Sequence, residues 1–355
     1  MTTTDQPTGL RKGEEIDAYA IDAYLKEHMV GLLGVPRIRQ FPGGASNLTY
    51  LLQYENIDLV LRRPPFGHKA KSAHDMGREF RILNRLHDGF PYCPKAYVHC
   101  TDESVIGSEF YVMERIEGII LRSDIPAELG FNAERNRELC LSFIDRMVEL
   151  HQVDYVKCGL SDLGKPEGYV RRQIEGWTNR YEQAMTPDAP AWTDVKLWLK
   201  EKMPADHYRP SLIHNDYRLD NVILAPEHPT KIIGVLDWEM TTIGDPLMDV
   251  GNTLAYWIQP DDSKPLQKLR RQPSHAPGML TRREFADYYA ARAGIQIDNL
   301  DYYYTYGLFR LAAIMQQIYY RYFHKQTQDE RFASFIYANT LLEQVSRQVI
   351  QLSRL

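Results

Sequence analysis

Cysteine is scarce in this sequence, and its four cysteines are scattered. Cys93, Cys100, Cys140 and Cys158 form no C-x-x-C pair. This spacing predicts neither a disulfide framework nor a zinc site, and it favours a reducing compartment, so we expect a cytoplasmic protein. The sequence also lacks the uninterrupted apolar run of ~18 residues that a membrane helix needs, and the first residues lack the apolar segment of a secretion signal. We therefore expect neither membrane spanning nor secretion.

Basic residues are not in excess either. The 355 residues include 42 Lys and Arg against 47 Asp and Glu, which gives a formal net charge of −5. Nonspecific binding to nucleic acid depends on positive charge, so nucleic acid is not an expected partner. The hydrophobic fraction of 44% and the charged fraction of 25% are those of an ordinary globular protein, and the length suffices for two domains.

The first third of the chain alternates short β-like stretches with turns and helices. Arg62 comes at the end of an apolar stretch that Pro64-Pro65 must terminate, because proline cannot continue a strand ladder. Glu79 falls on a helix that begins after a candidate capping box at 72–75. Helices are expected at 14–30 and after the capping box through Arg85, and strands between 38 and 60, at 59–63 and at 110–113, with a glycine-bearing turn at 41–47.

Beyond a boundary that we place near Glu117, most of the chain has helical patterns. One β-rich island at 211–237 interrupts them. The apolar residues recur at helical spacing in four main segments, at 133–151, 168–184, 192–203 and 302–323. The sequence thus predicts a first domain at 1–116 and a second, mostly helical domain at 117–355.

The island places polar residues at the ends of three short apolar strands. If 222–224 and 231–236 pair as a hairpin, Asn221 and Asp237 share its open end, and the loop with His214 and Asp216 leads to that end. Phosphoryl transfer from ATP needs a carboxylate that orients and deprotonates the acceptor hydroxyl, together with hard oxygen ligands for Mg²⁺. The spacing His214-x-Asp216-x4-Asn221, followed by a strand-end aspartate, is that of the protein-kinase catalytic loop. We expect His214 to brace this loop.

On these residues the chain resembles, over nearly its whole length, the superfamily of aminoglycoside phosphotransferases and choline-kinase-like enzymes. It is more narrowly similar to the subgroup found fused to acyl-CoA dehydrogenases, through FPGGASN at 41–47, VLRRPP at 60–65, AH at 73–74, REF at 78–80 and PGMLTRRE at 277–284. The resemblance implies an α+β, protein-kinase-like fold of two lobes. The small β-rich N-lobe would bind the nucleotide, and the larger helical C-lobe would carry the catalytic loop, the metal site and the acceptor site.

The same resemblance implies ATP and Mg²⁺ as cofactors and a role for each matching residue. Asp216 would be the base or hydroxyl-orienting group, and Asn221 and Asp237 would be the Mg²⁺ ligands. Arg62 stands where such kinases have a phosphate-clamping lysine, and Glu79 would be its ion-pair partner. The remaining contacts, with the ATP phosphates and beside the adenine, would come from Gly43, Gly44, Ser46, Asn47, Met113, Glu114 and Ile116.

The acceptor is expected to be a small hydroxylated molecule. Residues 260–275 carry four basic side chains against two acidic ones, which argues against a polycationic aminoglycoside and favours a neutral or anionic substrate. By resemblance to the dehydrogenase-fused subgroup, a hydroxyacyl compound is a candidate. An aminoglycoside kinase stays open as an alternative, as does a non-catalytic nucleotide-binding module. A metal-dependent hydrolase that uses His214, Asp216 and Asp237 is the third alternative.

Overall fold

The computed structural model describes residues 7–42, 47–65, 75–205 and 209–355. The chain divides into two compact units. The first unit comprises the chain through Ile120, a short segment at 154–160 and Asn221–Glu239, and the second comprises Leu121–Val153, Ser161–Asp220 and Met240–Leu355. Two later segments, separated in sequence from the first 120 residues, therefore join the first unit. The division into domains 1–116 and 117–355 stays a prediction.

A five-stranded antiparallel sheet forms the centre of the first unit. Its order is β1-β2-β3-β5-β4, so β5 lies between β3 and β4. The strands are β1 (Arg37–Gln40), β2 (Leu48–Gln53), β3 (Asp58–Arg63), β4 (Ala96–Cys100) and β5 (Phe110–Glu114). The register of β2 with β3 runs from Leu48 opposite Arg63 to Gln53 opposite Asp58. This register places Arg62 beside Thr49 on one neighbour and Tyr111 on the other.

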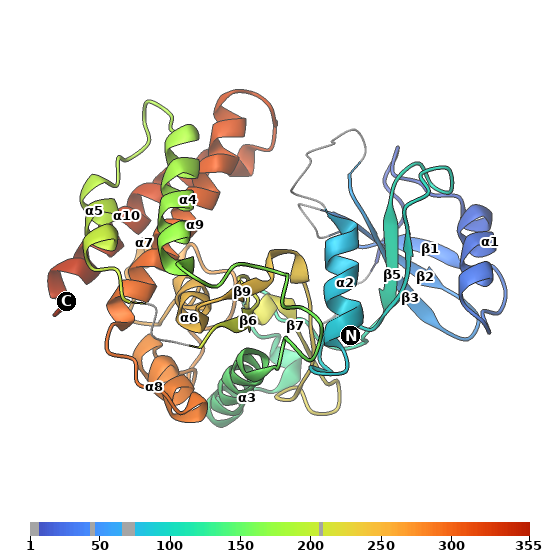
Figure 1. The fold of residues 1–355 in the computed structure, drawn as a ribbon, viewed down its shortest axis with the longest axis horizontal. Coiled ribbons are helices and arrows are strands. Elements are labelled where there is room, and N and C mark those ends of the chain that lie inside the picture. Colours follow the sequence, from blue (N-terminus) through green and yellow to red (C-terminus); the bar gives the residue numbers. More distant parts are fainter. Residues whose placement is uncertain (1–6, 43–46, 66–74, 206–208) are drawn as a thin grey trace. The chain divides into compact units, whose positions relative to one another are not determined.

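Two helices flank this sheet on opposite faces (Figure 1). Helix α1 (Ala18–His28), capped by Asp17, buries Ile21 and Leu25 against alternate strand residues such as Leu61 and Val112. Helix α2 (Met76–Leu86) is capped by Asp75 and packs against β4 and β5. Because side chains alternate along a strand, Arg62 points away from the α1 side and towards α2. The capping box was expected at 72–75, and 72–74 lie outside the described residues.

A small hairpin also belongs to the first unit. Strands β7 (Val222–Leu224) and β8 (Ile232–Val235) pair antiparallel, which confirms the hairpin predicted from the sequence. The segment after β5 runs along this hairpin, and Ile119 exchanges two backbone hydrogen bonds with Leu224 (2.9 and 2.8 Å). A Cβ atom on Gly118 would collide with Ile223 Cγ2 and Leu224 O, so the close approach of the two backbones requires glycine at that position.

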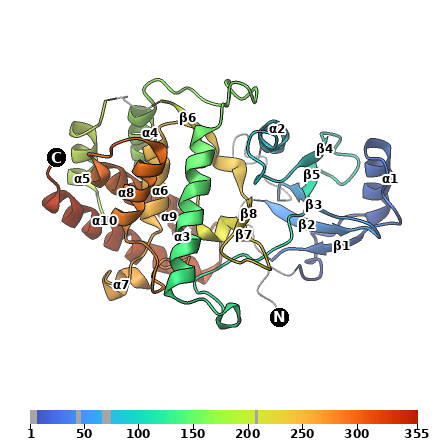
Figure 2. The same cartoon turned by 90° about the horizontal axis from the view of Figure 1, so that it is seen from below.

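The second unit is mainly helical. Its central helix, α9 (Leu300–Phe323), packs against α4 (Tyr169–Gln183), α6 (Pro246–Ala255) and α10 (Phe335–Leu352) (Figure 2). Gly251 and Gly307 let α6 and α9 touch backbone to backbone, since a Cβ atom on either would meet a main-chain oxygen. The other elements are α3 (Ala133–Gln152), α5 (Thr193–Glu201), β6 (Ser211–Ile213), β9 (Thr242–Gly244), α7 (Lys264–Gln267) and α8 (Arg282–Ala293).

These elements confirm the α+β class and most of the expected segments. The sequence did not predict β4, α7, α8, α10 or β9 as separate elements, and β9 pairs antiparallel with β6. Several aromatic residues of α9 pack in the core, as expected: Tyr302, Tyr303 and Phe309 are fully buried, whereas Phe323 at the end of the helix is 43% exposed. None of the helices in the described ranges combines the length and the apolar character that crossing a membrane requires.

Candidate active site

A buried ion pair joins the sheet to α2 in the first unit. Nη1 of Arg62 donates to Oε1 of Glu79, and the two side chains are only 12% and 2% exposed. Burial by itself lowers the pKa of Arg62, but the nearby acidic groups, with Glu79 foremost, raise it above its ordinary value, so the guanidinium stays charged. Burial raises the pKa of Glu79, and Arg62 opposes that rise. The pair therefore fixes a cation where β3 ends.

Asp237 lies beside this pair, just after β8. Its Oδ1 is 3.7 Å from Nη2 of Arg62 and has no hydrogen-bond partner among the described residues. Its backbone is left-handed, with φ of 69°, a conformation that non-glycine residues rarely adopt and that the surrounding structure must hold in place. One cation here faces the carboxyl groups of both Glu79 and Asp237. The unpartnered Oδ1 of Asp237 is an oxygen donor of the kind that suits a further cation.

Asn221 lies at the other strand end of the same hairpin. Leu236 N–H donates to its backbone oxygen (2.8 Å), which places the residue before β7 beside the residue before Asp237. Asn221 is buried, with 9% of its surface exposed. An amide oxygen and a carboxylate are hard donors of the kind that Mg²⁺ takes from proteins, with water and phosphate oxygens completing its shell. The pair thus fits Mg²⁺, whereas the described residues contain no cluster of three or more His, Cys, Asp or Glu side chains that could hold a metal by themselves.

The segment after Asp237 is tied to the rest of the first unit. Trp238 is almost fully buried, donates from Nε1 to Val235 O (2.8 Å) and packs edge-on against Phe90. Glu239 accepts from Asn47 Nδ2 at its carboxylate (3.3 Å) and from Arg78 Nη1 at its backbone oxygen (2.9 Å). Asn47, expected in the phosphate loop, is thereby connected to the segment that carries Asp237.

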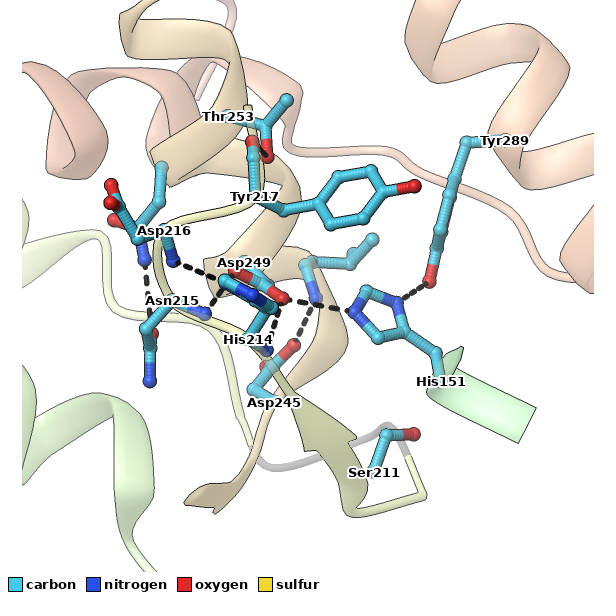
Figure 3. A network of polar contacts seen from close by, with 12 residues as sticks. His151, Ser211, His214, Asn215, Asp216, Tyr217, Asp245, Asp249, Thr253 and Tyr289 are labelled. Carbon is cyan, nitrogen blue, oxygen red and sulfur yellow. Dashed lines mark hydrogen bonds and ion pairs between the residues drawn. The ribbon is translucent and has the colours of Figure 1, made fainter. Parts of the chain in front are cut away.

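The loop with His214 and Asp216 belongs to the second unit, where Asp249 holds it. The carboxylate of Asp249, at the start of α6, accepts the backbone N–H groups of His214 and Asn215, both at 2.8 Å (Figure 3). Although burial opposes ionisation, the hydrogen bonds from the His151 side chain and from the backbone N–H of His214 lower the pKa of Asp249. An ionised carboxylate therefore fixes the loop backbone, and Asn215 takes a left-handed conformation with φ of 65°.

His151 and Tyr289 extend this network to α3 and α8. Nε2 of His151 is 3.2 Å from Asp249 Oδ2, and Nδ1 is 2.7 Å from the hydroxyl of Tyr289. Because a carboxylate can only accept, a neutral His151 carries its proton on Nε2 and accepts from Tyr289 at Nδ1. In Figure 3 the side chain of Asp216 points away from this cluster. The cluster therefore supports the loop and leaves the Asp216 carboxylate on its other side.

Asp216 itself is paired with a neighbouring arginine. Nε of Arg218 lies 3.2 Å from Asp216 Oδ1 and 3.4 Å from Asp220 Oδ1, and the guanidinium stacks over the ring of Tyr256 at 4.8 Å. Backbone N–H of Asp216 donates to His214 Nδ1 (3.2 Å), and His214 is fully buried. His214 therefore stabilises the turn, and the side chain of Asp216 keeps 19% of its surface exposed, against 14% for Asp220.

The other predicted site residues fall into two groups. Met113 and Glu114 end β5, and Ile116 follows in the segment that packs on the β7–β8 hairpin, where it lies against Gly234. Gly43, Gly44 and Ser46 lie outside the described residues. The roles of all these residues towards a nucleotide stay predictions. Three residues around the Asp216 loop were not predicted from the sequence. Arg218 lies within the catalytic-loop motif, but its charge was given no role, and no local pattern pointed to His151 or Tyr289.

Comparison with known proteins places the whole arrangement among phosphotransferases. The model of the phosphotransferase enzyme family matches residues 37–285. Acyl-CoA dehydrogenase family member 11 of Homo sapiens is 32% identical over 349 residues, which cover 96% of this chain and 43% of the relative. Acyl-CoA dehydrogenase family member 10 of Mus musculus is 36% identical over 319 residues, which cover 88% and 29%. The chain thus spans less than half the length of these relatives.

Solved structures show the same likeness. A candidate aminoglycoside phosphotransferase from Ralstonia eutropha JMP134 is 28% identical, with a TM-score of 0.82 over 96% of this chain and 100% of that one. Choline kinase from Cryptosporidium parvum has a TM-score of 0.60 at 13% identity over 94% and 97% of the two chains, which shows a shared fold.

Proposed function

Because this chain belongs to the phosphotransferase enzyme family, we propose that it transfers the γ-phosphate of ATP to a hydroxyl group of a small molecule, with Mg²⁺ as cofactor. The observation that carries the proposal is the cluster of Arg62, Glu79 and Asp237 at the ends of β3 and β8. Burying a cation with one carboxylate costs stability, and so does holding the residue that carries a second carboxylate in a left-handed backbone conformation. Such costs are typical of functional sites.

Each residue has a distinct task in this proposal. Asp216 orients and deprotonates the acceptor hydroxyl, and Arg62 pairs with the ATP phosphates while Glu79 holds it in place. Asn221 and Asp237 hold Mg²⁺, which when bound neutralises charge on the phosphates. The phosphate loop would comprise Gly43, Gly44, Ser46 and Asn47, and the adenine would lie beside Met113, Glu114 and Ile116. Catalysis then rests on positioning and on charge neutralisation more than on covalent chemistry by the protein.

The acceptor proposed here is a neutral or anionic hydroxylated compound such as a hydroxyacyl compound. Two observations support this choice: the basic balance of residues 260–275, and the relatives named as acyl-CoA dehydrogenase family members. An aminoglycoside acceptor is the alternative that the solved relative from Ralstonia eutropha suggests. Polycations favour acidic sites, so the basic segment disfavours it.

A non-catalytic nucleotide-binding module is the second candidate function. Arginine in place of lysine at position 62 favours it, because a planar guanidinium and a compact ammonium do not contact phosphates in the same way. The two candidates differ in turnover and not in nucleotide binding. Measuring turnover is therefore the test that separates them.

The experiment is an acceptor screen with Mg²⁺ and γ-labelled ATP. Short hydroxy acids, hydroxyacyl thioesters and aminoglycosides are tested for transfer of label by wild type, Asp216→Asn and the matched control Asp298→Asn, which changes an exposed aspartate of the second unit. The proposal predicts acceptor-dependent transfer that falls by about 10²–10⁴-fold in Asp216→Asn and is retained in the control. Equal transfer by wild type and Asp216→Asn would contradict the catalytic role, and a wild type that binds ATP without transfer to any acceptor would favour the non-catalytic module.

A further inference from the structure

The second unit contains a basic cavity next to α7. Its volume is about 420 Å³, and it is lined by Ser123, Lys264, Gln267, Lys268 and Arg270. Three of these five residues are cations and none is acidic. A cavity with this lining is suited to an oxyanion, because each cation can donate to the oxygen atoms of a phosphate or carboxylate group.

The two lysines are available to a ligand. Neither Lys264 nor Lys268 forms an ion pair or a side-chain hydrogen bond with any residue that the structure describes. Arg270, in contrast, is held in place, with Nη2 2.7 Å from Asp124 Oδ1 and Nε donating to Ser123 O (3.2 Å). Since Asp124 neutralises Arg270, the cavity keeps an excess of two positive charges from the lysines.

The spacing of the lysines strengthens this reading. Lys264 is the first residue of α7 and Lys268 is its C-cap, so they are four residues apart on one helical turn. Like charges at this spacing repel each other and destabilise a helix. An anion between the two side chains would replace that repulsion with two attractive contacts.

The wall of this cavity is connected to the loop that carries Asp216. Gln272, which follows Arg270 by two residues and is fully buried, accepts Leu219 N–H (2.8 Å) and donates to Tyr256 O (3.1 Å). The ring of Tyr256 in turn supports Arg218, the ion-pair partner of Asp216. Within the second unit, the cavity wall and the proposed base are thus linked through Gln272, Tyr256 and Arg218.

We propose that this cavity binds an oxyanion, and that the oxyanion is a phosphate or carboxylate group of the acceptor. The second half of this statement rests on the proposed function, whereas oxyanion binding does not require it. The acceptor is then an anionic hydroxylated molecule whose charged group is anchored by Lys264 and Lys268 while its hydroxyl reaches Asp216. The same charges repel a polycationic acceptor.

The test is calorimetric titration of the full chain with inorganic pyrophosphate and with citrate, after protein and buffers have been passed over a chelating resin so that no metal takes part. The double variant Lys264→Gln/Lys268→Gln removes the two available cations. The matched control is Lys200→Gln/Lys202→Gln, which removes two exposed lysines at the end of α5. We expect wild type and control to bind at least one probe equally well, the double variant to lose at least tenfold in affinity, and added NaCl to weaken the binding.

The two probes separate the two sources of the anion. Tighter binding of pyrophosphate assigns the cavity to a phosphate group, and tighter binding of citrate assigns it to a carboxylate. No binding of either probe at millimolar concentration, or equal affinity in wild type and the double variant, overturns the proposal. A shift of the unfolding temperature by Mg²⁺-ATP, measured on the same wild-type sample, tests the nucleotide site separately. An intact shift without oxyanion binding therefore refutes only the cavity, and oxyanion binding without the shift refutes only the kinase assignment.

Discussion

The Arg62–Glu79 ion pair can serve stability or function. Replacing each of its two members alone, and then both together, tests which of the two it serves. The two side chains are 12% and 2% exposed, so either single change leaves a buried charge without its main partner. Breaking a buried pair in this way costs about 3–5 kcal/mol, whereas replacing both members by apolar residues of similar volume is often close to neutral. Glu79→Leu is expected at the low end of that range, because Arg62 keeps Asp237 at 3.7 Å.

Arg62→Met should in addition make stability depend on pH. Burial already raises the pKa of Glu79 and Arg62 opposes the rise, so without the guanidinium the folded-state pKa lies well above the unfolded value. The folded state then holds a proton that the unfolded state releases, and the free energy of unfolding falls as pH rises through the interval between the two pKa values. Wild type should show the same dependence more weakly, because Arg62 opposes the rise in the pKa of Glu79.

The assay is urea unfolding followed by circular dichroism for wild type, Arg62→Met, Glu79→Leu and the double variant, at several pH values. We expect each single change to lower the free energy of unfolding and the double change to recover most of that loss. The two positions are then coupled by a few kcal/mol. The double variant should still fail to bind Mg²⁺-ATP, which would separate the functional role of Arg62 from stability. Single losses that simply add in the double variant would refute the coupling.

Three further changes address the supports of the site, each measured by urea unfolding. Asp249→Ala removes the acceptor of two loop N–H groups and should lower the free energy of unfolding by about 2–4 kcal/mol. It should also lower turnover, and unchanged stability would contradict the bracing role. Tyr289→Phe removes only the hydroxyl on His151 and should cost about 1 kcal/mol; a loss as large as that of Asp249→Ala would show that Tyr289 does more than donate to His151. Gly118→Ala forces a Cβ atom onto Ile223 and Leu224 and should lower the free energy of unfolding by about 1–3 kcal/mol. Gly9→Ala, with nothing within 4 Å of the added atom, should be close to neutral. Equal effects would refute the close approach of the two backbones at Gly118.

Much of the fold could be predicted from local patterns. The hairpin of β7 and β8 is one example, because two apolar runs flank a turn with two prolines and both strand ends carry polar residues. The amphipathic pattern of α2 likewise indicated a helix carrying Glu79. These features depend on residues that are neighbours in sequence, where hydrophobic periodicity and turn chemistry act directly.

The missed features depend on contacts between distant parts of the chain. Strand β9 has only three residues and is stabilised by pairing with β6, so Thr242–Gly244 has no alternation to detect. The links from His151 to Asp249 and to Tyr289 span 98 and 138 residues. No local sequence pattern shows that His151, at the end of α3, contacts Asp249 and Tyr289. Only the folded chain brings these residues together.

The most direct test of the central claim is the unfolding temperature with and without Mg²⁺-ATP, for wild type, Asp237→Ala and Asp88→Ala. Asp88 is an exposed aspartate of the first unit and serves as the matched control. Ligand at ~100 times its dissociation constant adds about 2.7 kcal/mol to the folded state, which raises the midpoint by a few degrees. We expect a shift that needs Mg²⁺, persists in Asp88→Ala and disappears in Asp237→Ala. A wild type without a shift at millimolar nucleotide, or an equal shift in Asp237→Ala, would contradict it.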